Sequence, residues 1–96
     1  MSRRNTAETL SATMKVLAEP TRLQIISLLA GRRGGETWSW LIAGLGLGRR
    51  PSNLTFHLRK LEEVGLVRRR PSAPHVYYEL STEAVEQVAA AIGRLR

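Results

Sequence analysis

The chain contains no cysteine and no aspartate, and only two of its 96 residues are histidine. Without cysteine there is no disulfide, no thiolate metal site and no thiol redox switch. The adjacent glutamates Glu62 and Glu63 point in different directions and cannot form a facing pair of catalytic carboxylates. No glycine-rich phosphate loop with its lysine is present. We therefore expect neither an enzyme nor a bound cofactor or metal.

Long hydrophobic runs are also missing. No apolar stretch approaches the roughly 18 residues that a membrane span needs, and the start, MSRRNTAETL, lacks the apolar core of a secretory signal. We expect a single cytoplasmic domain over residues 1–96, with a flexible basic arm at residues 1–5 and no membrane association. A domain of this size buries well under three quarters of its unfolded surface, so a subunit interface would add useful burial.

Positive charge is concentrated in one quarter of the chain. The formal net charge is +7, from 15 lysines and arginines and eight glutamates. The segment from Arg49 to Arg70 holds seven of the cations and two of the glutamates, which makes it +5 and leaves +2 for the rest. A basic field confined to one segment indicates a polyanionic partner, although a high arginine content on an ordinary solvated surface would give the same composition.

The first thirty residues contain two apolar patterns with helical spacing. The first pattern predicts an amphipathic helix from about Thr6 to Leu17. Because proline disfavours a helical residue before it, Glu19-Pro20 separates this helix from a second one that is stopped at Gly31. The residues expected to face inward are Ala7, Leu10, Met14 and Leu17 in the first helix and Leu23, Ile26, Leu29 and Ala30 in the second.

The most informative segment is Pro51–Val64. Leu54, Leu58 and Leu61 recur at spacings of four and three, so they fall on one face of a helix. The other faces begin with short hydrogen-bonding side chains and carry cations farther along. That arrangement suits a helix lying in the major groove of DNA.

A short buried helix is expected before this segment and a β-hairpin after it. The apolar stretch Trp38–Leu45 predicts the helix, with its two tryptophans filling core. Leu66–Arg70 and Val76–Leu80 read as strands that flank PSAPH, whose two prolines mark the turn. The second strand alternates in polarity, so the face with Val76, Tyr78 and Leu80 is expected to be buried.

A final helix is capped by Ser81 or Thr82 and reaches about Ile92. The order of four helices, a β-hairpin and a fifth helix is typical of a mainly α winged helix-turn-helix domain with an added helix at each end. Both end helices are apolar along one side and lie outside the central motif, which favours a homodimer; alternatively, both fold back onto the monomer core. The residues expected at the dimer interface are Leu10, Met14, Leu17, Val85, Val88, Ala89 and Ile92.

Eleven residues are candidate DNA contacts. Ser52, Asn53 and Thr55 can meet base edges or phosphates, unless Ser52 only caps the helix and Asn53 is merely exposed. Phe56 is expected to be exposed and to touch a thymine methyl, or to pack against the wing or the preceding helix. The cations expected at phosphates are Arg49, Arg50, Arg59, Lys60, Arg68, Arg69 and Arg70.

Further expectations concern the two arginine groups and the two histidines. For Arg49 and Arg50 the alternative to phosphate contact is a solvated turn, and Arg68–Arg70 should alternate between the faces of a strand. His57 follows Leu54 by three residues and is expected to pack rather than bind metal, and His75 is expected to be solvated or near a phosphate.

Three segments together resemble the ArsR/SmtB family of transcription regulators. They are LAEPTRLQIISLL (Leu17–Leu29), SNLTFHLRKLEEVGLV (Ser52–Val67) and VYYEL (Val76–Leu80), in the family's order and at similar spacing. The resemblance implies a homodimer joined through the first and last helices, with Pro51–Val64 in the major groove. It also implies an inducer that weakens DNA binding.

The metal-sensing branch of this family is not matched. Its members carry cysteines near the third helix, where this chain has TWSWLIAG (Thr37–Gly44). The last helix has no histidine, and Glu83 and Glu86 alone would be poor zinc ligands. The signal therefore stays open between an organic small-molecule effector, a partner protein and none.

The sequence predicts a sequence-specific, double-stranded DNA-binding transcription regulator, a repressor that binds an inverted-repeat operator as a homodimer. One alternative is a winged-helix module whose basic face binds an acidic protein. Another is a nucleoid or double-stranded RNA binder without sequence preference. The polar cluster Ser52–Phe56 argues against the latter, because a backbone binder needs only cations.

Overall fold

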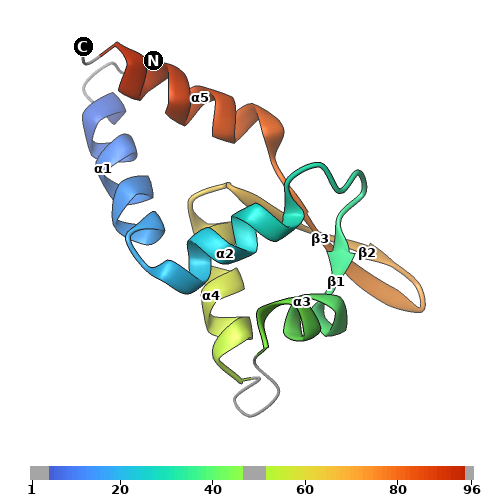
Figure 1. The fold of residues 1–96 in the computed structure, drawn as a ribbon. Coiled ribbons are helices and arrows are strands. Elements are labelled where there is room, and N and C mark those ends of the chain that lie inside the picture. The colour runs from blue at the N-terminus through green and yellow to red at the C-terminus, as the bar shows by residue number, and fades with distance from the viewer. Residues whose placement is uncertain (1–4, 47–51, 95–96) are drawn as a thin grey trace.

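The computed structural model describes residues 5–46 and 52–94 (Figure 1). The helices are α1 Asn5–Leu17, α2 Pro20–Leu29, α3 Trp38–Leu45, α4 Ser52–Glu63 and α5 Thr82–Gly93, and the strands are β1 Glu36–Thr37, β2 Val67–Ser72 and β3 His75–Leu80. This is the mainly helical winged helix-turn-helix fold that the sequence predicts. Residues 1–4 of the predicted arm lie outside the described residues. None of the helices in this part of the chain has the length and apolar character of a membrane span.

The core is built around one face of α4. Leu54, Leu58 and Leu61 are at most 1% exposed, as their spacing predicts. They pack with buried side chains of α2, α3 and the start of β2, which are Ile25, Leu29, Leu41, Leu66 and Val67. Burial of three leucines on one face fixes the rotation of α4 about its axis, so its remaining faces have a defined direction.

The inward face of α2 differs from the prediction. Leu23 is 49% exposed and Ala30 is exposed, whereas Ile25 is fully buried beside the correctly predicted Leu29. Ile26 is half-buried. The reason is that apolar residues surround much of this helix, so spacing alone does not identify which side meets the core.

A third strand, β1, joins the wing and was not predicted. It pairs antiparallel with β3, with Glu36 opposite Tyr78 and Thr37 opposite Tyr77, so the sheet order is β1-β3-β2. Two residues are too few to show the alternation by which strands are recognised. Gly35 leads into β1 with φ +80°, and a Cβ at this position would overlap the carbonyl oxygen of Tyr78.

The wing is longer than the sequence indicates. Ser72 pairs with His75, so only Ala73 and Pro74 form the turn rather than the whole PSAPH segment. Val76 is 39% exposed, which corrects the expectation that it is buried. Tyr78 and Leu80 do pack against the core, whereas Val76 lies farther along the hairpin, toward its turn.

The two end helices lie away from α3 and the first turn of α4 (Figure 1). Ser81 caps α5 by accepting a hydrogen bond from the Ala84 amide, as predicted. Within Thr82–Gly93 no residue is fully buried. In α1 the expected inward stripe is only partly covered, because Ala7 and Met14 are exposed.

Candidate nucleic-acid interface

The face of α4 opposite its buried leucines is polar and accessible. Asn53, Thr55, Phe56 and Arg59 are all exposed there. Ser52 begins the helix, and the candidate contacts Arg49 and Arg50 lie outside the described residues. The helix therefore presents short hydrogen-bonding groups, one aromatic ring and a cation on its outer side.

Thr55 is positioned by the helix that precedes it. The indole Nε1–H of Trp38 donates a hydrogen bond to Thr55 Oγ1 at 3.2 Å. Trp38 and Trp40 are half-buried and pack against the core, as predicted. Because a hydroxyl accepts and donates, Thr55 keeps its own O–H for a base edge or phosphate.

Phe56 is 51% exposed, as the helical phase predicts. The ring contacts cations from two helices: the guanidinium of Arg22 lies 5.6 Å from its centroid and the ammonium of Lys60 lies 5.5 Å away. Cations placed at this distance from an aromatic face are attracted to it. Arg22 was not among the candidate contacts, because its proximity to Phe56 arises only when α2 packs on α4.

The three arginines of β2 alternate in direction, as predicted. Arg68 and Arg70 both contact the carboxylate of Glu79 on β3, at 3.2 and 3.1 Å. Arg69 points the other way and lies 4.0 Å from Glu62 on α4. Neither glutamate was predicted from the sequence to contact these arginines.

Arg70 differs from its neighbours because it holds the wing to the turn before β1. Its Nη2 donates a hydrogen bond to the Gly34 carbonyl at 2.6 Å, and its guanidinium lies 5.0 Å from the Tyr77 ring. Arg68 and Arg69 have more exposed side chains, at 67% and 61% against 44% for Arg70. These two cations are therefore the more accessible ones in the wing.

The remaining cations of α4 are available to an anion. Lys60 lies 3.8 Å from Glu63, an exposed pair whose contribution to stability is about 0–1 kcal/mol. Among residues 5–46 and 52–94, Arg59 forms no ion pair within 4.0 Å. A phosphate could replace the glutamate beside Lys60 at little energetic cost, so the basic face stays competent for a polyanion.

Comparison with known proteins agrees with this geometry. Residues 17–70 match the family model described as a helix-turn-helix domain. A crystal structure of a "possible transcriptional regulator for arsenical resistance" is 32% identical, with 86% of this chain and 82% of that chain covered and a TM-score of 0.71. Among curated protein sequences, none matches the chain.

Two further solved structures are similar over almost the whole chain. One is the homodimeric winged helix-turn-helix DNA-binding domain of a possible ArsR-family regulator from Mycobacterium bovis, with 27% identity, 99% and 86% coverage of the two chains, and a TM-score of 0.73. The other is the transcriptional repressor BigR from Xylella fastidiosa, with 25% identity, 100% and 98% coverage, and a TM-score of 0.69.

A buried leucine face, an exposed polar face on α4 and a β-hairpin wing define a DNA-binding winged helix-turn-helix protein rather than an enzyme. The chain belongs to the ArsR family of transcription regulators. It does so without the cysteines of the metal-sensing members.

Proposed function

We propose that the chain is a sequence-specific transcriptional repressor in which α4 is the reading helix. The observation that carries this proposal is the two-sided character of α4, with leucines buried on one face and Asn53, Thr55 and Phe56 exposed on another. Asparagine and threonine can hydrogen-bond to base edges in the major groove, and an aromatic ring can contact a thymine methyl. The similarity to a protein described as a transcriptional repressor supports the direction of regulation.

The cations around the reading helix supply affinity and orientation in this proposal. Phosphate contacts position a protein on the duplex without reading sequence. Arg59 and Lys60 on α4 and Arg68 and Arg69 in the wing are the described cations assigned to phosphates, and Arg70 acts mainly by holding the wing in place. Ser52, Arg49 and Arg50 at the entrance of α4 complete the proposed contact set.

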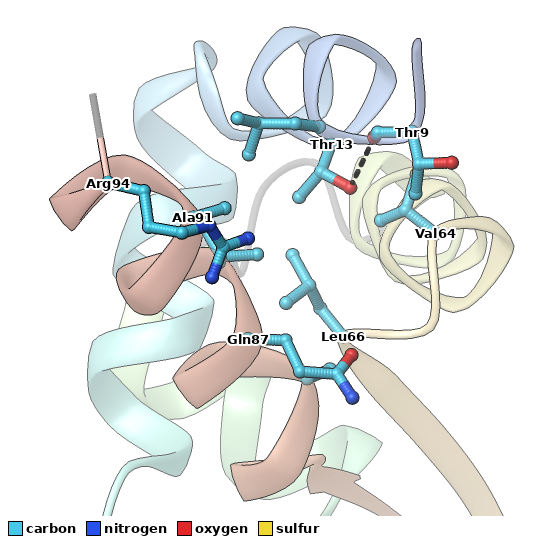
Figure 2. A pocket seen from close by; sticks show the side chains of 10 residues that line it. Thr9, Thr13, Val64, Leu66, Gln87, Ala91 and Arg94 are labelled. Atoms are coloured by element: carbon cyan, nitrogen blue, oxygen red, sulfur yellow. Dashed lines mark hydrogen bonds between the residues drawn. The ribbon is translucent and has the colours of Figure 1, made fainter. Parts of the chain in front are cut away.

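We further propose that the repressor is a homodimer through α1 and α5. A groove of about 390 Å³ separates these two helices, with Val64 and Leu66 lining it between them (Figure 2). Beside it, Met14 and Ile92 are each 42% exposed, an unfavourable placement for large apolar side chains in water. The similar Mycobacterium bovis domain is described as homodimeric.

The individual interface residues contribute to different degrees. Met14, Ala89 and Ile92 are exposed and free to meet a second copy, and Leu10 lines the groove. The half-buried residues Leu17, Val85 and Val88 pack partly on their own core and support the interface from beneath. Two-fold symmetry would place two reading helices in successive major grooves about 34 Å apart, so the dimer would select an inverted repeat. In this proposal the protein acts on DNA in the cytoplasm.

Separate alanine variants distinguish affinity from sequence reading. Replacing Arg59 and Lys60 together should weaken binding to every duplex alike. It removes four phosphate contacts per dimer and should lower the slope of log affinity against log salt by about four. Asn53→Ala or Thr55→Ala should instead lower affinity for the preferred duplex only, by about 1–3 kcal/mol for each half-site. Fluorescence anisotropy of labelled duplexes over a salt series measures both effects, and Lys15→Ala on the exposed side of α1 is the matched control.

Three results would contradict the proposal. If the double alanine variant binds duplexes as the wild type does at low salt, the docking of α4 is wrong. Equal affinity of the wild type for all duplexes would identify a binder without sequence preference. Salt-sensitive binding to an acidic protein but not to duplex DNA would identify a protein-interaction module.

A further inference from the structure

One side chain from α2 contacts the reading helix at its exposed face. Arg22 donates a hydrogen bond from Nε to Nδ1 of His57 at 3.0 Å, and another from Nη1 to the carbonyl oxygen of Val16 at 3.1 Å. Its guanidinium also lies 5.6 Å from the centroid of the Phe56 ring. Arg22 therefore joins the end of α1, the start of α2 and the middle of α4.

Glu19 fixes the backbone next to this contact. Its Oε1 caps α2 by accepting hydrogen bonds from the amides of Thr21 and Arg22, at 2.7 and 3.2 Å. The same oxygen lies 4.0 Å from Nδ1 of His57. Glu19 thus fixes the backbone at the start of α2 through the cap, which restricts the positions from which the Arg22 guanidinium reaches His57.

These contacts restrict the orientation of the Phe56 ring. An exposed phenylalanine on a helix surface has several rotamers available to it. Here the ring contacts Arg22 on α2 and Lys60 one turn along α4, and it meets the His57 ring edge-on with centroids 5.6 Å apart. These contacts favour one orientation of the ring before any DNA is bound.

We propose that Arg22 is a positioning residue that sets the base preference at the base pair facing Phe56, without reading a base itself. The inference rests on the proposed role of α4 as the reading helix. A ring held in one orientation contacts a thymine methyl at a defined place, whereas a mobile ring loses rotamer freedom on binding and discriminates less. Arg22 acts through His57 and Phe56, so its effect is local to one position of each half-site.

Arg22→Lys separates this role from the effect of charge. Lysine keeps the positive charge, but its single ammonium cannot reproduce the two fixed donor directions of a guanidinium. We expect Arg22→Lys to reduce base discrimination about fivefold at one symmetry-related pair of positions, the size of effect of one lost hydrogen bond. Competition binding against duplexes with each single base change in the wild-type preferred site measures this. Discrimination elsewhere and the salt slope should not change, and Arg33→Lys in the exposed turn after α2 should change nothing.

Variants of His57 test the same contact without touching Arg22. Asparagine can place its amide oxygen near the position of Nδ1 and accept from Arg22, whereas glutamine places its oxygen farther out. We therefore expect His57→Asn to retain more discrimination at the affected position than His57→Gln does. Adding Arg22→Lys to Phe56→Leu should cause no loss beyond that of Phe56→Leu alone.

The results separate this inference from the proposed function. A uniform loss of discrimination across the site, additive effects of Arg22→Lys and Phe56→Leu, or equal behaviour of the two His57 variants would overturn the positioning role. If the wild type prefers an inverted repeat and Arg22→Lys has the same preferences, the inference alone is wrong. If the wild type prefers no sequence, the inference and the proposed function are both wrong.

Discussion

At the scale of single residues, Gly35 leaves the least room for a side chain among the described glycines. Its φ of +80° lies in the left-handed region, and an added Cβ would also meet the Glu79 Cβ at 2.8 Å. The close approach of Gly35 to β3 is what allows β1 to pair with the hairpin. A short turn of the chain thus controls how the wing joins the body of the domain.

We expect Gly35→Ala to lower the free energy of unfolding by about 3 kcal/mol, from backbone strain and steric overlap together. Gly31 supplies the matched control, because it has φ +78° but no atom within 4 Å of an added Cβ in the described part of the chain. Gly31→Ala should cost only the backbone strain, roughly 1 kcal/mol. Urea denaturation of the two variants measures the difference, and equal losses would show that the contact with β3 is not the cause.

At the scale of elements, α2 and α4 differed in how well their buried faces could be predicted. The leucines of α4 stand apart from its polar residues, so the buried face, the exposed Phe56 and the direction of the reading surface all followed from spacing. In α2 the apolar residues are too evenly distributed, and Leu23 was assigned to the wrong side. Spacing identifies a face only where a polar side exists to contrast with it.

The contacts of the candidate site were less accessible to sequence reasoning than its helices. Arg22 and His57 are 35 residues apart, and Arg70 and Gly34 are 36 apart. Such pairs form only when the elements pack, and a single sequence carries no local signal for them. The exposed residues of the proposed reading helix could thus be predicted from the sequence. Their contacts with residues from other elements could not.

The wing gives a prediction at the same scale, because Arg69 and Arg70 are neighbours with different surroundings. Arg70→Ala removes hydrogen bonds to Gly34 and Glu79 and should lower the free energy of unfolding by about 1–2 kcal/mol. Arg69→Ala should leave stability unchanged, since its contact with Glu62 is exposed and 4.0 Å long. It should instead reduce the salt slope of DNA binding by about two, one contact for each subunit of the dimer.

Thermal unfolding and salt-dependent anisotropy of the two wing variants measure these effects side by side. The reverse pattern, with Arg69→Ala destabilising the fold and Arg70→Ala altering only DNA binding, would contradict this assignment. It would show that Arg69 holds the wing and that Arg70 contacts phosphate.

At the scale of the whole molecule, the two proposed binding surfaces lie on different elements. The cations of α4 and β2 lie on the elements that we propose to face DNA, together with the exposed Phe56, whereas the exposed Met14 and Ile92 lie on the end helices. This separation suits a molecule that binds a second copy with one side and a polyanion with the other. Exposed Leu23 on α2 belongs to neither proposed surface.

The proposed dimer can be tested with charge placed on its apolar side. Met14→Glu together with Ile92→Glu should convert the dimer to monomer at micromolar concentration, because two glutamates per chain would be desolvated in the interface. Leu23→Glu, at a slightly more exposed apolar position, should leave the dimer intact. Sedimentation velocity gives the oligomeric state. Dissociation caused by Leu23→Glu but not by the double variant would place the interface elsewhere.

The most direct test of the central claim is selection of binding sites from a pool of random duplexes by the wild-type protein. A reading helix presented twice by a symmetric dimer should select an inverted repeat whose half-sites are centred about 10–10.5 base pairs apart. Recovery of a single asymmetric site, or of duplexes with no shared sequence, would contradict the account.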